Sequence, residues 1–360
     1  MSSATYRTAI TTFKHTSKSR FNALFWSSVA ATGAIASYAY NQQSKDPKTP
    51  IPNVLDKALF GFGASKFEAN ARDASVAKTQ EYYQQVYNAI AQKLIDVDDY
   101  DYGSYGPLLV RLAWHNSGSY DQNDNTNTKG GSFAGTMRFK KEQADPENAG
   151  LVKGIEYLRS IHEKFPEISH GDLFTLGGVV AIQELGGPKV AWRPGRTDLG
   201  EDATPPYERL PAASHEEGDY IRTVFNKRMG FTDKEMVCLI GVGHSLGRCH
   251  VQNSGYDGPW TFSPTVVSNE FFKLLLSEDW REKKWTGKRQ YEDEATHSLM
   301  MLPADMALKK DSNFLKYVKE YAEDEEKCLN DFATAFSKLL ERGIKFNVAP
   351  MYFKTLDEQS

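Results

Sequence analysis

One short stretch, Gly106-Pro-Leu-Leu-Val-Arg-Leu-Ala-Trp-His115, most constrains what this chain can fold into. Gly-Pro suits the start of a helix, because proline lacks only an N–H that would be unpaired at the first helical position. On a helix with about 3.6 residues per turn, Arg111, Trp114 and His115 project from one face. A permanent cation, a large aromatic ring and a titratable base would then share one pocket wall.

Such a wall suits the heterolysis of a peroxide bond. A neutral imidazole can take the proton from one oxygen and deliver it to the other, which leaves as water. A guanidinium stabilises the negative charge that develops on the leaving oxygen. Taken alone, the stretch fits equally well an amphipathic core helix in which Arg111 extends to the surface and His115 is hydrogen-bonded. A second motif is needed to choose between these interpretations.

A second histidine-bearing helix is indicated after Phe231. Thr232 and Glu235 form the sequence pattern of a capping box, and the chain then runs into Gly-Val-Gly-His-Ser-Leu-Gly-Arg-Cys-His, with His244 in the middle. Gly241 and Gly243 each cost roughly 1 kcal/mol of helix stability relative to alanine. That cost is understandable if a flat ligand lies against the backbone with His244 bound to its centre.

Together the two motifs resemble those of the haem peroxidases of the plant, fungal and bacterial superfamily. Arg-Leu-Ala-Trp-His115 is similar to the distal haem motif of the intracellular class, and the segment around His244 is similar to its proximal motif. The resemblance extends from about residue 80 to the C-terminus. It implies a mainly α-helical, two-lobed enzyme with minor short strands. One protohaem (haem b) would lie between a distal lobe at about 78–210 and a proximal lobe at about 211–350.

The resemblance also implies roles for single residues. Asn148 would accept a hydrogen bond from His115, so that the imidazole nitrogen facing the haem is free to take a proton. His244 would be the axial ligand of the haem iron, and the buried Asp305 would bind both His244 and Trp260. The expected catalytic residues are Arg111, Trp114, His115, Asn148, Trp260 and Asp305, and the expected cofactor contacts are His244, Ser245, Arg248 and His250.

The implied reaction is the reduction of hydrogen peroxide to water with electrons from ferrocytochrome c, through ferryl haem and a radical on Trp260. A non-catalytic haem sensor is the weakest interpretation, because Arg111, His115 and Asn148 are all present. The chain is also too short for the duplicated second domain of the catalase-peroxidases.

An ascorbate peroxidase, or an enzyme that uses both donors, is the main alternative. Ascorbate peroxidases typically have Arg where this chain has Asn253. They often hold a cation near the Trp with an Asp, at the position of Ser268 here. Without a carboxylate a hard cation is poorly held, although Thr261 and Ser263 could still supply oxygens. The residues therefore favour cytochrome c and leave a dual-substrate enzyme open.

Docking of cytochrome c, which presents a ring of lysines around its haem edge, requires an acidic face. The resemblance places Asp98 and Asp99, before the distal helix, and Asp357 and Glu358, at the C-terminus, near docking positions of the fungal family members. The segment 260–263 would then carry the electron inward. Ordinary solvated charge is the alternative reading of both acidic groups.

The N-terminal part has the composition of a mitochondrial transit peptide. The first 45 residues contain five Lys or Arg, many Ser and Thr, and no Asp or Glu. The uncharged segment Phe21 to Tyr40 is just long enough to span a bilayer but is built largely of small residues. We expect residues 1–62, leader and linker, to be removed. A peroxidase domain at 63–360 would then be released into the mitochondrial intermembrane space without a permanent membrane anchor; a single-pass anchor and the matrix are the alternatives.

The net charge and the cysteine content further restrict the class of protein and the partners that it can bind. Residues 63–360 contain 36 Lys and Arg against 45 Asp and Glu, a formal net charge of −9. Such an acidic body attracts cationic partners and repels nucleic acid. The three cysteines, Cys238, Cys249 and Cys328, indicate no disulfide framework.

Overall fold

The structure is a computed structural model that describes residues 71–360. The chain divides into two units, Met1–Ala69 and Asn70–Ser360, and every element described below belongs to the second. The predicted transit peptide, the Phe21–Tyr40 segment, the linker and the cleavage near residue 62 lie outside the described residues. Between residues 71 and 360 there is no helix with the length and apolar character needed to cross a bilayer.

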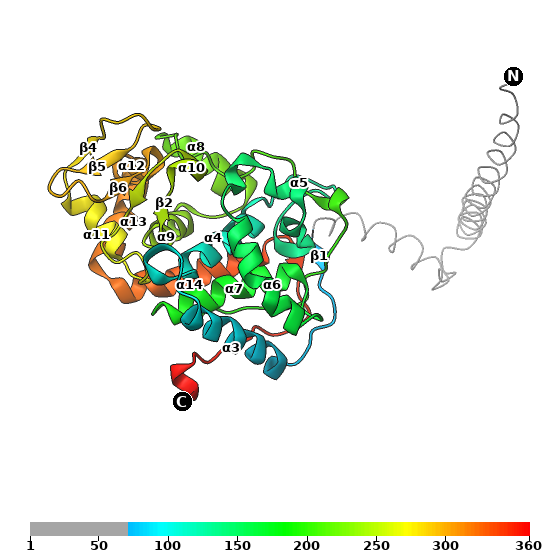
Figure 1. The fold of residues 1–360 in the computed structure, drawn as a ribbon. Coiled ribbons are helices and arrows are strands. Elements are labelled where there is room, and N and C mark those ends of the chain that lie inside the picture. The colour runs from blue at the N-terminus through cyan, green and yellow to red at the C-terminus, as the bar shows by residue number, and fades with distance from the viewer. Residues whose placement is uncertain (1–70) are drawn as a thin grey trace, which may run out of the picture. The chain divides into compact units, whose positions relative to one another are not determined.

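The second unit is mainly α-helical with short strands, which confirms the predicted fold class (Figure 1). The helices up to the middle of the chain are α3 (Gln80–Asp96), α4 (Gly106–Gly118), α5 (Lys140–Gln143), α6 (Val152–Lys164) and α7 (His170–Glu184). Those that follow are α8 (Gly218–Arg222), α9 (Asp233–His244), α10 (Val251–Ser254), α11 (Glu270–Ser277), α12 (Pro303–Lys310), α13 (Ser312–Glu323) and α14 (Glu325–Glu341).

Three small sheets join segments that are distant in sequence or lie at turns. Strand β1 (Arg72–Asp73) pairs in parallel with β7 (Ile344–Lys345), so the start and the end of the unit are tied together. Strand β2 (Arg248–Cys249) pairs antiparallel with β3 (Gly258–Pro259). The third sheet is antiparallel in the order β4 (Trp280–Glu282), β5 (Tyr291–Asp293) and β6 (Met300–Met301).

The two helices that carry the histidine motifs begin where their sequences predict. Pro107 occupies the first turn of α4. At α9, the Thr232 hydroxyl accepts from the Glu235 N–H while the Glu235 carboxylate accepts from the Thr232 N–H, so the predicted capping box is present. This box satisfies two of the four N–H groups that a helix start leaves unpaired. The local sequence therefore determines where each motif helix starts.

The packing of α4 on α7 positions the distal motif. A Cβ atom built on Gly178 of α7 would lie 2.4 Å from the Cβ of Ala113 on α4, so only glycine lets the two helices approach this closely. Helix α14 packs against both α4 and α9 and runs across the unit in Figure 1. The two histidine-bearing helices are thus held by one shared neighbour.

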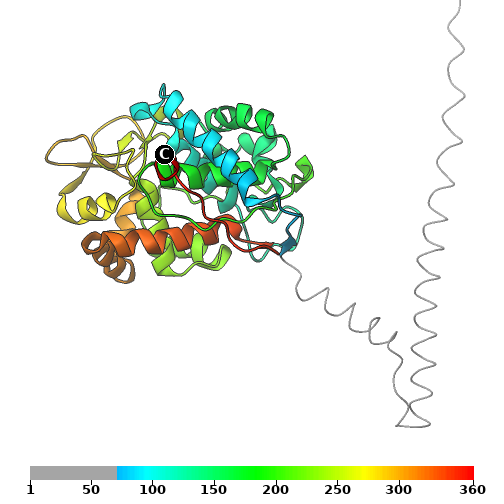
Figure 2. The ribbon, with the colours of Figure 1, turned by 90° about the horizontal axis from the view of Figure 1, so that it is seen from below.

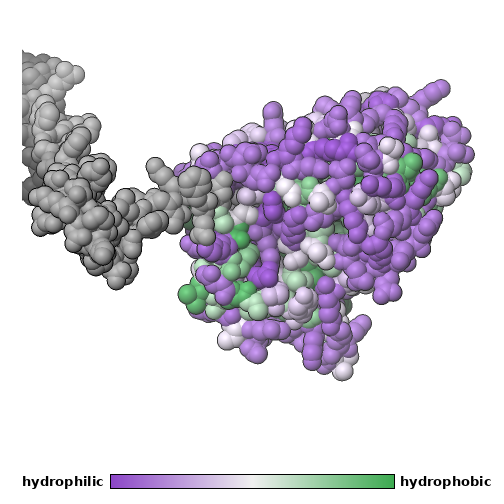
Figure 3. Space-filling view, turned by 180° about the vertical axis from the view of Figure 1, so that it is seen from behind, coloured by the Kyte–Doolittle hydropathy of each residue, from purple (hydrophilic) through white to green (hydrophobic). Residues whose placement is uncertain are grey.

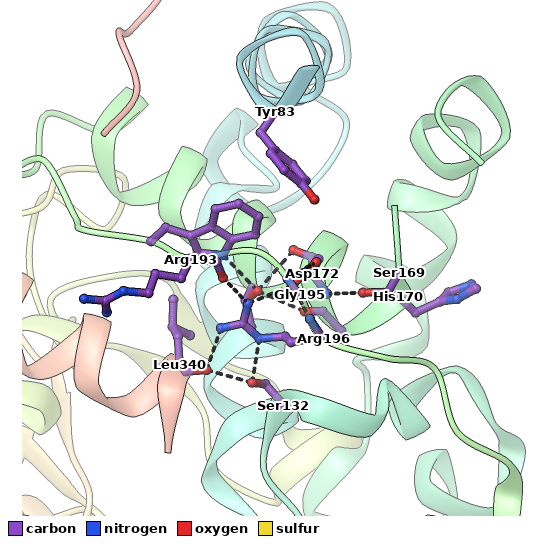
Figure 4. Close-up of polar contacts among 12 residues, drawn as sticks. Tyr83, Ser132, Ser169, His170, Asp172, Arg193, Gly195, Arg196 and Leu340 are labelled. Atoms are coloured by element: carbon purple, nitrogen blue, oxygen red, sulfur yellow. Dashed lines mark hydrogen bonds and ion pairs between the residues drawn. The ribbon is translucent and has the colours of Figure 1, made fainter. Parts of the chain in front are cut away.

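A buried ion pair ties α7 to the end of α14, and sequence reasoning did not anticipate it (Figure 4). Arg196 is 1% exposed, and its Nη1 donates to Asp172 Oδ1 over 2.8 Å. Its Nη2 donates to the Leu340 carbonyl over 2.7 Å, and its Nε donates to the Ser132 hydroxyl over 2.8 Å. The Gly195 N–H adds a further bond to Asp172. Because both charges are hydrogen-bonded on several sides, burial of this pair is tolerated.

Two local features were not anticipated from the sequence. Asn148 ends a short 3₁₀ turn, Pro146–Asn148, that Asp145 caps, and α6 begins at Val152 without a side-chain cap. A π-helical segment, Thr223–Arg228, follows α8 and had no sequence prediction. The face shown in Figure 3 is covered largely by hydrophilic residues, with apolar residues in small separate groups.

Candidate active site

On the distal side, the structure brings His115 and Asn148 together. His115 Nδ1 lies 2.9 Å from Asn148 Oδ1, and Asn148 Nδ2 donates to the Glu142 carbonyl over 2.9 Å. The second bond fixes the amide so that its oxygen faces the imidazole, and Nδ1 must therefore be the donor. The Nε2 atom of His115 is left as an acceptor.

The electrostatics of this pocket keep the imidazole neutral. Burial and then the charge of Arg111 hold the pKa of His115 well below its usual value. Because the unperturbed pKa of histidine is about 6.5, the ring carries no proton on Nε2 at neutral pH. A buried, neutral imidazole with a fixed tautomer is a ready proton acceptor.

The turn that holds Asn148 also holds Arg111. Nη1 of Arg111 donates to the Ala149 carbonyl and Nη2 donates to the Glu147 carbonyl, each over 3.0 Å. Burial lowers the pKa of Arg111, but arginine stays charged at any physiological pH. Trp114 packs against the π-helical segment: its ring is stacked on Phe225, with centroids 5.5 Å apart and planes 3° apart. The three predicted distal residues therefore lie on one side of α4.

On the proximal side, one buried carboxylate joins the predicted residues. Asp305 has no exposed surface. Its Oδ1 lies 2.8 Å from His244 Nδ1, and its Oδ2 accepts the Trp260 indole N–H over 2.8 Å and the Leu302 N–H over 2.7 Å. The rings of His244 and Trp260 are stacked, with centroids 4.3 Å apart. Pro303 starts α12 and places Asp305 in its first turn, where negative charge is favoured.

The surroundings of His244 fit a flat, iron-bearing cofactor. Because Nδ1 is bound to Asp305, Nε2 is the free coordinating atom, and the side chain is 30% exposed although α9 is a core helix. A Cβ atom on Gly243 would meet nothing within 4 Å, so open space adjoins the helix there. At position 241, glycine is needed for a reason other than the expected cofactor contact. A Cβ atom there would lie 2.1 Å from the Phe272 ring.

The other expected cofactor contacts already have protein partners. His250 Nε2 lies 2.8 Å from Asp101 Oδ2, and Arg248 Nη2 donates to Asp257 over 2.8 Å. The Ser245 hydroxyl donates to the Val242 carbonyl over 2.7 Å, within its own helix. The hydroxyl of Thr261, one candidate for a cation ligand, donates to the Ser245 carbonyl over 2.9 Å. In the described part of the chain, no three His, Cys, Asp or Glu side chains are grouped to hold a metal ion.

The docking acids expected from the sequence all lie at the surface. Asp98, Asp99, Asp357 and Glu358 are exposed, and Glu358 also forms an ion pair with Lys189 at 2.8 Å. The C-terminal segment runs along α3, where Gln359 and Asn88 exchange hydrogen bonds. Asp98 and Asp99 follow the C-terminal end of that same helix. Asp101, which follows Asp98 and Asp99, is bound instead to His250, which lies 149 residues further along the chain and which the sequence did not indicate as its partner.

The helical fold, the buried His115 bound to Asn148 and the His244 bound to Asp305 fit a peroxidase of the haem-dependent class. The chain belongs to the peroxidase family, whose sequence pattern it matches over residues 83–324. Membership of this family implies haem.

Three relatives share the name "Cytochrome c peroxidase, mitochondrial". The protein from Yarrowia lipolytica is 58% identical over 268 residues, which cover 74% of this chain and 77% of the relative. The Candida glabrata protein is 49% identical over 337 residues, 91% of this chain and 92% of the relative. The Candida albicans protein is 50% identical over 345 residues, 92% of this chain and 91% of the relative.

Proposed function

We propose that this chain reduces hydrogen peroxide to water with electrons from ferrocytochrome c, using one b-type haem per chain. The observation that carries the proposal is the Asp305 bridge, in which one buried carboxylate holds both a coordinating histidine and a stacked tryptophan. A histidine alone would suit many haem proteins. The bridge to Trp260 adds a redox-active side chain beside the cofactor site. The names of the relatives support the choice of cytochrome c as donor.

The distal residues supply the proton chemistry. When bound at His244 Nε2, haem supplies an iron centre at which peroxide can bind and be reduced. His115 Nε2 accepts the proton from one peroxide oxygen and returns it to the other, which leaves as water. Arg111 provides positive charge for the oxygen that gains negative charge. Asn148 acts as a positioning residue because it fixes the tautomer on which this transfer depends.

The proximal residues set the electron-donor strength of His244 and stabilise positive charge on Trp260. The carboxylate of Asp305 accepts the Nδ1–H bond of His244 and so makes the imidazole a stronger electron donor through Nε2. It also stabilises positive charge on the Trp260 indole, to which it is hydrogen-bonded. Trp260 is therefore suited to hold one oxidising equivalent until an electron arrives from outside.

We propose that cytochrome c docks beside Asp98, Asp99 and Asp357. These carboxylates are exposed at the end of α3 and along the C-terminal segment that packs on it. Phe262, two residues beyond Trp260, is 57% exposed, so the route inward begins at the surface. Acidic steering of a cationic partner raises the association rate by roughly 10-fold or more and weakens with added salt.

The decisive experiment compares steady-state peroxide turnover with ferrocytochrome c and with ascorbate. Trp260→Phe should abolish turnover with cytochrome c while the first reaction with peroxide persists. The charge reversal of Asp98, Asp99 and Asp357 to Lys should weaken donor binding and flatten its salt dependence. Reversal of Asp202, an exposed carboxylate of the 3₁₀ turn Glu201–Ala203, serves as the control for charge alone. Faster turnover with ascorbate than with cytochrome c would contradict the proposed donor.

We also propose that the mature enzyme resides in the mitochondrial intermembrane space after removal of residues 1–62. The basic, Ser- and Thr-rich N-terminus and the relatives' mitochondrial names support this. N-terminal sequencing of the native protein, combined with fractionation of mitochondria, tests it. Recovery of Met1 or of the Phe21–Tyr40 segment in the mature protein would favour a membrane-anchored form.

A further inference from the structure

The β4–β5 hairpin is a basic element on an acidic domain. From Arg281 to Arg289, five of the nine residues are Lys or Arg and one is acidic, whereas residues 63–360 carry a formal net charge of −9. Strands β4 and β5 pair antiparallel, so most of this basic run forms the loop between them. In Figure 1 and Figure 2 the hairpin lies at the outer edge of the unit.

The arginines and the lysines of this run differ in their partners. Arg281 is paired with Glu292, and Arg289 is paired with Glu216 and Glu282. In contrast, the loop lysines Lys283, Lys284 and Lys288 form no ion pair within residues 71–360. Lys284 and Lys288 are exposed, and Lys283 is half-buried. The loop therefore presents three positive charges that no ion pair in this part of the chain neutralises. Lys288 does act on one carboxylate, since burial raises the pKa of Glu147 and the charge of Lys288 opposes that rise.

Aromatic rings hold this loop in one shape. The Trp285 indole N–H donates to the Lys288 carbonyl over 2.9 Å, and the ring covers Gly287, where a Cβ atom would come within 2.2 Å of it. Lys283 Nζ lies 5.0 Å from the centre of the Trp285 ring, and Lys288 Nζ lies 5.3 Å from the Tyr256 ring. The lysines are thus presented by a preorganised loop that also carries a half-buried tryptophan.

We propose that the β4–β5 hairpin docks the protein on the surface of an anionic phospholipid bilayer. A sheet of anionic headgroups offers negative charge over an area as wide as the loop, and each lysine near it contributes roughly a 5-fold gain in binding. Tryptophan favours the boundary between headgroups and acyl chains, because its ring is apolar and its N–H is polar. The acidic remainder of the domain is repelled by the same surface. Binding is therefore oriented, with the hairpin toward the lipid.

Vesicle co-sedimentation of the holoenzyme tests the proposal. The vesicles contain phosphatidylcholine alone or phosphatidylcholine with phosphatidylglycerol. The triple variant Lys283→Gln, Lys284→Gln and Lys288→Gln should bind the anionic vesicles roughly 100-fold more weakly than the unaltered protein. The matched control removes three exposed lysines elsewhere, namely Lys140, Lys141 and Lys319, and should bind as before. Circular dichroism and the haem spectrum verify that both variants are folded.

A local measurement distinguishes lipid binding by the hairpin from lipid binding by the basic N-terminal segment, which can bind anionic lipid by itself. Lipids brominated near the headgroup should quench tryptophan fluorescence in the unaltered protein and in the control, and much less in Trp285→Phe. Added salt should release the protein, while glycerol phosphate at the same ionic strength should release no more than the salt does. Equal binding to neutral vesicles, an unaffected triple variant, or quenching that persists in Trp285→Phe would each overturn the proposal.

Discussion

Replacement of Asp305 by Asn gives the sharpest test of the proximal site, because it keeps the shape of the side chain and removes its charge. The carboxylate has two acceptor oxygens, one for His244 and one for both Trp260 and Leu302. An amide has a single acceptor oxygen, and its nitrogen can only donate. Either His244 or Trp260 therefore faces a donor in the variant.

The size of the effect follows from Coulomb's law. A unit positive charge on the Trp260 indole and the carboxylate about 4 Å away attract each other by about 4 kcal/mol at an effective dielectric constant of 20. Loss of that attraction disfavours the oxidised indole by roughly 10³-fold, at about 1.4 kcal/mol per factor of ten. Turnover with cytochrome c should fall by a comparable factor.

Two measurements on the Asp305→Asn variant separate this effect from general damage. Stopped-flow mixing with peroxide should show a first step within a few-fold of the original rate, because His115 and Arg111 are untouched. Electron paramagnetic resonance of the peroxide-treated variant should show loss of the tryptophan radical signal. Wild-type cytochrome c turnover together with an undiminished radical signal would refute the reasoning from charge.

Three further predictions concern other parts of the structure. His115→Leu should slow the reaction with peroxide by roughly 10²- to 10⁴-fold in stopped-flow measurements, because proton acceptance and delivery are lost together. Burial raises the pKa of Glu142 to about 7, so the folded state favours the neutral form of this carboxyl group. The stability that this group contributes is fully present below about pH 4.5 and is lost as the pH rises through 7. Glu142→Gln should therefore remove up to roughly 3 kcal/mol of the fall in unfolding free energy between pH 5 and pH 8, measured by urea denaturation. Arg196→Met leaves the Asp172 carboxylate buried without its partner and should cost about 3–5 kcal/mol, and a second change, Asp172→Asn, should restore part of that loss in the same assay.

Local sequence patterns predicted the helices that carry the site but not the contacts between them. The capping box of Thr232 and Glu235 and the proline of α4 act within a few residues, so their structural effect can be recognised in the sequence. The His115–Asn148 and His244–Asp305 contacts were expected only through a family resemblance. Periodicity within one helix carries no information about which distant residue lies opposite it.

Two ion pairs were also not predicted, because they too join residues that are distant in the sequence. Asp101 lies in an acidic run, and such a run gives no indication that one member is bound to His250. Arg196 and Asp172 are separated by 24 positions and belong to different segments, so neither residue signals the other. Burial makes such pairs specific, but burial is a property of the assembled fold. A count of acidic residues in the sequence therefore exceeds the free acidic charge at the end of α3.

The close contact between Gly178 and Ala113 means that this enzyme can be inactivated from inside its core. A methyl group at position 178 has no space unless α4 shifts away from α7. Such a shift would carry His115 out of line with Asn148, which is held by a different turn. A substitution in α7, an apolar helix that contains no reacting group, is therefore expected to abolish activity. A mutational screen restricted to haem-facing residues would overlook it.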